Sequence, residues 1–91
     1  SKAFFWNSDL TGADLSDTMA EMAQFRKSKL TNAVLDRMNM PRGSLVKAHL
    51  TGASFKDANL YQADFLRSTI TNTDFNGANL DFTLIEHWRP K

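Results

Sequence analysis

The chain has 91 residues, no cysteine, and 11 lysines and arginines against 10 aspartates and glutamates. This length suits one domain, and a formal charge of +1 excludes a strong overall field that would attract nucleic acid. The lack of cysteine excludes disulfides and thiolate chemistry, and no apolar run approaches the roughly 20 residues that span a bilayer.

Taken in chain order, every fifth residue is apolar, from Phe5 without interruption to Ile85. The residue two positions before each of them is small (Ala, Ser, Thr or Gly), with the one exception of Met38. A period of five fits neither an α-helix nor a flat strand. The pattern therefore predicts a chain that turns a corner at fixed intervals, with the fifth residues inside.

The repeat resembles that of the pentapeptide-repeat family, Ala-(Asp/Asn)-Leu-x-x. The closest matches are Ala13-Asp14-Leu15, Ala58-Asn59-Leu60, Ala63-Asp64-Phe65 and Ala78-Asn79-Leu80, and the resemblance covers residues 3–85. It implies an all-β fold, a right-handed quadrilateral β-helix in which four five-residue sides make one coil of about 20 residues. The chain would then form about four coils.

Residues twenty apart resemble one another, as this fold requires. We number the sides by their central residues: side one at 5, 25, 45 and 65, side two at 10, 30, 50 and 70, side three at 15, 35, 55 and 75, and side four at 20, 40, 60 and 80. After side two, Thr is always followed by Gly or Asn, which predicts a type II turn in every coil, with positive φ at Gly12, Asn32, Gly52 and Asn72. Asn39, Asn59 and Asn79 predict a ladder of stacked amides. Met38 is expected to fill space beside the small Ala20, with any irregularity of the coil at 19–22 and 38–43.

We interpret residues 1–91 as a single domain in which 86–91, where the repeat stops, form a C-terminal cap. Apolar residues gather near the two ends of the repeat: Phe4, Phe82, Leu84 and Trp88. They fit either a cap or the contacts of an end-to-end homodimer, and the resemblance implies that such dimers occur in the family.

Groups able to support catalysis are scarce in this sequence. His49 and His87 fall on different sides and nearly two coils apart, and no cysteine is present. Histidines and carboxylates at metal-ligand spacing and Gly-rich phosphate loops are also missing from the sequence. We therefore predict that the protein is not an enzyme and has no cofactor, metal or catalytic residues.

One part of the outer surface combines basic and apolar residues. On side one, the two residues after the central position give Trp6, Arg26, Lys27, Val46, Lys47, Leu66 and Arg67. Such a mixture is typical of recognition surfaces, although a merely solvated surface rich in lysine gives a similar pattern. We treat these seven residues as the candidate partner face.

The resulting hypothesis is a rigid, non-catalytic scaffold that presents a flat face to a protein partner. The segment Thr31–Met38 resembles one found in short thylakoid-lumen pentapeptide proteins, which implies an auxiliary or assembly subunit of a photosynthetic or other membrane-associated complex. Two alternatives are a DNA mimic that interacts with a type II topoisomerase, which would require an acidic rod, and a targeting or spacer module of a bacterial secreted effector. Thylakoid lumen and bacterial cytoplasm are the compartments considered. The sequence leaves open the partner, the oligomeric state and whether the chain is a fragment.

Overall fold

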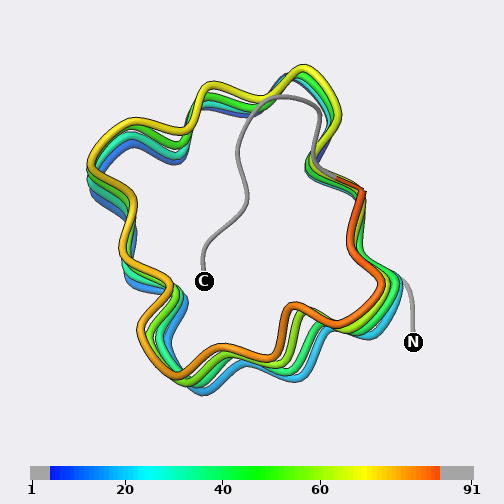
Figure 1. The fold of residues 1–91 in the computed structure, drawn as a ribbon. Coiled ribbons are helices and arrows are strands. Elements are labelled where there is room, and N and C mark those ends of the chain that lie inside the picture. Colours follow the sequence, from blue (N-terminus) through cyan, green and yellow to red (C-terminus); the bar gives the residue numbers. More distant parts are fainter. Residues whose placement is uncertain (1–4, 85–91) are drawn as a thin grey trace.

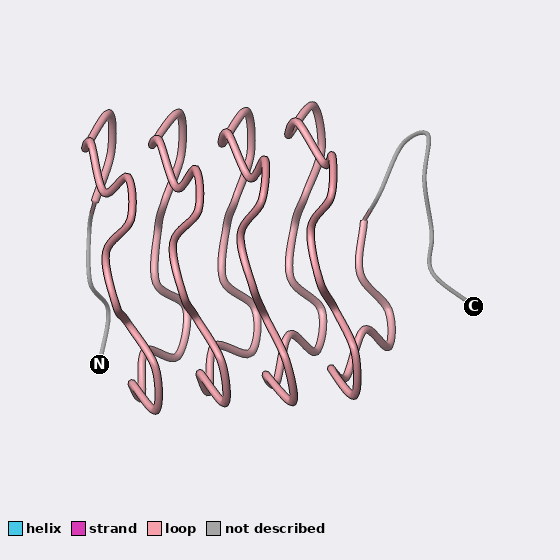
Figure 2. Ribbon diagram, turned by 90° about the vertical axis from the view of Figure 1, so that its left-hand side faces the viewer, coloured by secondary structure: helices cyan, strands magenta, loops and turns pink. Residues whose placement is uncertain are grey.

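In the computed structural model, which describes residues 5–84, the chain winds into a stack of four-sided coils. Figure 1 looks along the stack, where successive coils superpose, and Figure 2 shows the same coils from the side. Within residues 5–84 there is no helix, and the β-structure consists of isolated parallel bridges rather than longer strands. Each bridge joins residues twenty apart, for example Asp14 to Val34 and Val34 to Ser54. The predicted coil of 20 residues is therefore confirmed.

Each side has the same local structure, which the second coil illustrates. Ala23 and Phe25 point inward and are fully buried, whereas Gln24 between them forms the bridge to Ser44. The carbonyl oxygen of Phe25 then accepts a hydrogen bond of 3.1 Å from the amide of Ser28, which closes a turn over residues 26–27. Small residues at the first inward position leave room for the large central residues of neighbouring sides.

Three corners after side two are turns with the predicted positive φ, +72° at Gly12 and Gly52 and +58° at Asn32. The turn expected at 71–72 is wrong, because these residues form a bend, although φ of Asn72 is also positive. The same left-handed conformation occurs at all the other described corners, including Lys27 (φ +58°) and Phe82 (φ +59°). Glycine and asparagine are therefore sufficient but not necessary for it. From Asn7 to Gln62, hydrogen bonds between coils hold ordinary residues in this conformation, because the amide of the left-handed residue donates to a carbonyl of the next coil.

At one of these corners a residue larger than glycine would also displace a neighbouring side chain. A Cβ atom on Gly52 would lie 2.3 Å from Oδ1 of Asn32, whose side chain extends over this position from the preceding coil. A Cβ on Gly12 would meet nothing within 4 Å. Glycine at position 52 therefore suits both the positive φ of this corner and the close approach of the Asn32 side chain.

The interior is filled by the central residues, and its C-terminal half contains three phenylalanine rings in mutual contact. The rings of Phe55 and Phe75 stack with centroids 5.2 Å apart, and Phe65 packs edge-on against both. Phe65 is only 1% exposed. Central residues of the first and last coils, such as Phe5 and Leu80, are partly buried against this core.

The methionine-rich region is regular, so the irregularity expected at 19–22 and 38–43 is not found there. Met38 is buried, as predicted, and its contact with Ala20 stays a prediction. Met19 is 78% exposed and forms the ordinary bridge to Asn39. Met19 does not disturb the coil, because its large side chain lies outside and adds no volume to the interior.

Polar side chains join coils at several points. Nδ2 of Asn59 donates to Oδ1 of Asn39 at 2.9 Å, which confirms this step of the predicted ladder. Residues 71–72 form a bend rather than a hydrogen-bonded turn, and beside it Thr73 donates its hydroxyl to the carbonyl of Leu50 at 2.8 Å. The buried Ser28 hydroxyl likewise donates to the carbonyl of Phe5. These bonds satisfy polar groups that the interior would otherwise leave unpaired.

Candidate functional site

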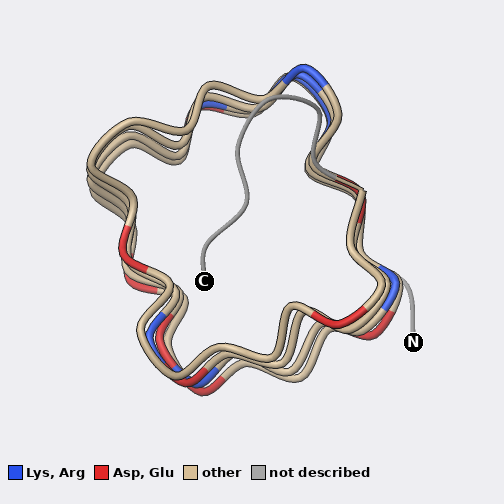
Figure 3. Cartoon of the chain, viewed as in Figure 1, with Lys and Arg blue, Asp and Glu red and all other residues tan. Residues whose placement is uncertain are grey.

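The seven residues of the candidate partner face lie on one corner of the coil stack. They occupy the equivalent turns of four successive coils, the turns that follow side one: 6–7, 26–27, 46–47 and 66–67. We call these eight turn residues the basic ridge. Figure 3 shows its lysines and arginines as a blue column along one corner. Their position corrects one aspect of the sequence interpretation: the residues form a convex ridge rather than a flat face, because the positions after each central residue are turn positions.

Backbone hydrogen bonds hold the ridge in register along the axis. The amide of Asn7 donates to the carbonyl of Arg26 at 3.0 Å, and that of Lys27 donates to Val46 at 2.9 Å. In the same way, the amide of Lys47 donates a hydrogen bond to the carbonyl of Leu66 at 3.0 Å. Because the turns are tied to one another, the side chains are displayed at the spacing of the coils, about 4.8 Å as in a sheet.

Two columns of different chemistry run along the ridge. The second turn position gives Lys27, Lys47 and Arg67, with φ of +58°, +61° and +62° and exposed side chains. The first turn position gives Val46 and Leu66 in the third and fourth coils, both half-buried. An apolar strip therefore lies directly beside a cationic one.

At the N-terminal end of the ridge, the first two coils form an open cleft. It has a volume of about 170 Å³ and is lined by Trp6, Asn7, Arg26 and Lys27. Trp6 is 55% exposed. The cleft combines an aromatic ring, an amide and two cations, but it is smaller than the roughly 300–1,000 Å³ of small-molecule sites. It has room for one side chain.

The ridge differs electrostatically from the other charged corners. Its eight residues include four lysines and arginines and no aspartate or glutamate. Elsewhere acidic and basic residues are mixed: Arg42 pairs with Glu21 at 3.3 Å, and Lys56 pairs with Asp74 at 3.8 Å. The positive potential is thus concentrated along one corner of a chain whose formal charge is only +1.

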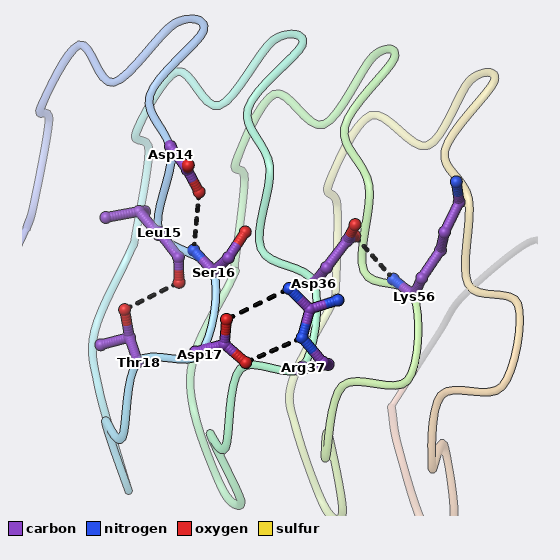
Figure 4. Close-up of polar contacts among 8 residues, drawn as sticks. All are labelled: Asp14, Leu15, Ser16, Asp17, Thr18, Asp36, Arg37 and Lys56. Carbon is purple, nitrogen blue, oxygen red and sulfur yellow. Dashed lines mark hydrogen bonds and ion pairs between the residues drawn. The ribbon is translucent and has the colours of Figure 1, made fainter.

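The diagonally opposite corner, formed by the turns after side three, is mixed to acidic (Figure 4). Nε and Nη2 of Arg37 donate to the carboxylate of Asp17 at 2.8 and 3.1 Å, and this bonding lowers the pKa of Asp17. The Ser16 amide donates to Asp14 at 3.0 Å, and hydrogen bonding from Ser16 lowers the pKa of Asp14. Asp36 similarly accepts a bond from the amide of Lys56 in the next coil.

Two of the four candidate end contacts are described by the structure, and both are exposed. Phe82 is 71% exposed and packs edge-on against Tyr61, with ring centroids 5.7 Å apart. Leu84 is 52% exposed and bridges to Asp64. Phe4, Trp88 and the expected cap at 86–91 lie outside the described residues, so the cap and the dimer stay predictions.

Other kinds of site find little support in the described part of the chain. Residues 5–84 contain no group of three or more His, Asp or Glu side chains that could hold a metal ion. In the same range, no helix has the length and apolar composition that crossing a membrane requires. Sequence reasoning did not predict the cleft at Trp6, although the register of twenty residues already placed Trp6 and Arg26 on adjacent coils.

The four-sided coils, the parallel bridges between residues twenty apart and the inward fifth residues define the class of right-handed quadrilateral β-helices. A family model described as "Pentapeptide repeats (8 copies)" matches residues 23–57 and 48–81, together more than half of the chain. The chain therefore belongs to the pentapeptide-repeat family. Proteins of this family are generally structural and non-catalytic.

Similar solved structures include two pentapeptide-repeat proteins. One is from the thylakoid lumen of Arabidopsis thaliana, with a TM-score of 0.58, 25% identity, and coverage of 89% of this chain and 60% of the other. The second, Rfr23 from the cyanobacterium Cyanothece 51142, gives a TM-score of 0.51 and 25% identity over 92% of this chain and 61% of the other. The chain thus spans less than two thirds of either protein. No curated protein matches it.

Proposed function

We propose that the protein is a non-catalytic scaffold whose basic ridge docks onto a protein partner. The observation that carries the proposal is a column of exposed cations, free of acidic residues, beside half-buried aliphatic side chains. Tryptophan and arginine are enriched among the residues that dominate binding energy at protein interfaces. Both lie at the cleft that begins the ridge.

The rigidity of the coils supports this role. Bonds between coils fix the ridge backbone before any partner arrives, so binding would require little ordering of the chain itself. A DNA mimic would need a sustained negative field that resembles phosphates. We do not favour that alternative, because the acidic corner contains Arg37 and Lys56 and the diagonally opposite corner is basic.

A pull-down from native source material tests the proposal. Wild type is compared with the ridge variant Lys47→Glu/Leu66→Glu/Arg67→Glu, which changes the charge by −5. The control Val34→Glu/Arg42→Glu/Lys56→Glu has the same charge change distributed over other parts of the surface, and both variants are first checked for folding by circular dichroism. We expect a partner that is retained by the control and lost by the ridge variant. Retention by both would refute the ridge as the docking surface.

We further propose the thylakoid lumen as the compartment and an auxiliary subunit of a membrane-associated complex as the cellular role. Two observations support this: a protein of similar fold comes from that lumen, and residues 31–38 resemble a segment of such proteins. Fractionation of the native source, with immunodetection of the chain in the lumenal fraction, tests the compartment. Detection only in other fractions would refute it.

A further inference from the structure

We propose that the basic ridge binds an acidic amphipathic helix, which lies along the stack with one acidic side chain in the cleft at Trp6. This inference rests on the proposed function and specifies the chemistry and secondary structure of the partner. Its three supports are the spacing of the ridge, the order of its two columns and the size of the cleft.

The spacing of the ridge matches a helix better than an extended peptide. Three coil steps, from the turn at 6–7 to the turn at 66–67, span about 14.4 Å at the usual spacing of stacked strands. Along one face of a helix, four successive side chains are separated by steps of 3, 4 and 3 residues. These three steps advance ten residues in total, or about 15 Å along the helix axis. Same-face residues of an extended strand would cover about 20 Å over three steps. Only the helix keeps one side chain opposite each coil.

The order of the columns specifies the partner's surface. Lys27, Lys47 and Arg67 are exposed, and Val46 and Leu66 lie beside the last two of them. A helix with glutamates along one edge and leucines along the next would place carboxylates against the cations and bury aliphatic surface against the neighbouring column. Charged pairs at such a rim would fix orientation and register, whereas the apolar contacts would add affinity.

The cleft provides an anchor at one end of the ridge. Arg26 and Lys27 offer donors to a carboxylate, and the Trp6 ring offers apolar surface to its methylene groups. A volume of about 170 Å³ is sufficient for one side chain of the size of glutamate. The helix would therefore be held at one fixed point, which sets its position along the axis.

Features of the same surface disfavour a nucleic acid. Single-stranded nucleic acids stack their bases on successive aromatic side chains, but Trp6 is the only aromatic residue of the ridge. Val46 and Leu66 offer no polar group to a sugar-phosphate backbone.

Fluorescence anisotropy with synthetic peptides tests the inference. The probe is a labelled, side-chain-stapled helix with Glu at positions spaced 3, 4 and 3 apart and Leu beside them. Its control has the same composition with the Glu residues distributed around the helix. We expect the patterned helix to bind at least fivefold more tightly at low ionic strength, where exposed charges are least screened.

Two variants form a matched pair for this assay. Lys47→Gln and Arg42→Gln each remove one positive charge at the second turn position, where φ is +61° in both cases. Gln62 occupies the same position with φ of +57°, so glutamine is compatible with it. We expect Lys47→Gln to weaken binding about two- to fivefold, as is typical for an exposed ion pair, and Arg42→Gln to leave it unchanged. Trp6→Ala should weaken binding by about fivefold or more.

Equal losses for the two glutamine variants, equal binding of the two peptides, or no binding of either peptide would each overturn the inference. Tighter binding of a labelled single-stranded oligodeoxynucleotide that Lys47→Gln reduces would overturn it in favour of a nucleic-acid surface. If the ridge variant loses a native protein partner while the patterned helix fails to bind wild type, the helix inference is wrong and the proposed scaffold function stands.

Discussion

Replacement of Phe65 by alanine tests the packing of the interior most directly. The ring is 1% exposed, and its edge-on contacts to Phe55 and Phe75 have centroid separations of 6.2 and 5.6 Å. Removal of a buried phenylalanine ring typically costs about 3–5 kcal/mol, and aromatic pairs add about 0.5–1.5 kcal/mol each beyond burial, so we expect a value near the upper limit. A 91-residue domain is typically stable by about 5–14 kcal/mol, so this loss is a large fraction of the total.

Urea denaturation followed by circular dichroism measures this loss, and Phe82→Ala is the matched control. Phe82 undergoes the same chemical change but is 71% exposed, so its replacement should cost mainly its edge-on contact with Tyr61, about 0.5–1.5 kcal/mol. A loss below about 1 kcal/mol for Phe65→Ala, or equal losses for the two variants, would refute the packing described here.

The corner glycines provide a second test: Gly52→Ala should destabilise more than Gly12→Ala, although φ is +72° at both, because only the Cβ at Gly52 collides with Asn32. Equal shifts of the thermal midpoint would contradict the close approach. For the acidic corner, Arg37→Gln should raise the pKa of Asp17 toward its ordinary value in an NMR titration. Because the folded-state pKa is lowered, the pair stabilises the fold above the unfolded pKa, and this contribution is lost as pH falls through the folded pKa. An unchanged pKa of Asp17 in the variant would show that Arg37 is not what lowers it.

The sequence was sufficient to predict the architecture, because the apolar residues that recur every five positions are those that form the core. The register of twenty residues also predicted the pairing of Asn39 with Asn59, which form a hydrogen bond. Arg37 and Asp17 are likewise twenty residues apart and form hydrogen bonds, but this pair was not predicted. The left-handed backbone at Lys27 could not be predicted in this way. Lysine has no local preference for that conformation, which arises from bonding to the next coil.

The sequence grouped the residues of the candidate partner face but did not predict the shape of the surface they form. All seven residues were grouped from their spacing, since residues twenty apart must stack, and their role in binding stays a prediction. Their place on a convex corner follows from the turn hydrogen bonds, which place the two residues after each central residue outside the ring. The cleft at Trp6 depends on how side chains of adjacent coils lie relative to one another, and a repeat pattern does not contain that information.

The register of twenty has a consequence for how such chains can change length. Insertion of five residues, for example after Arg67, would preserve every inward position and leave the core intact. It would nevertheless move all later residues by one quarter of the perimeter, so that any column of surface side chains would continue on a different corner. Insertion of twenty residues would lengthen the stack and keep each corner aligned. A surface that depends on alignment along the axis therefore tolerates growth only in whole coils, although the hydrophobic core accepts single repeats.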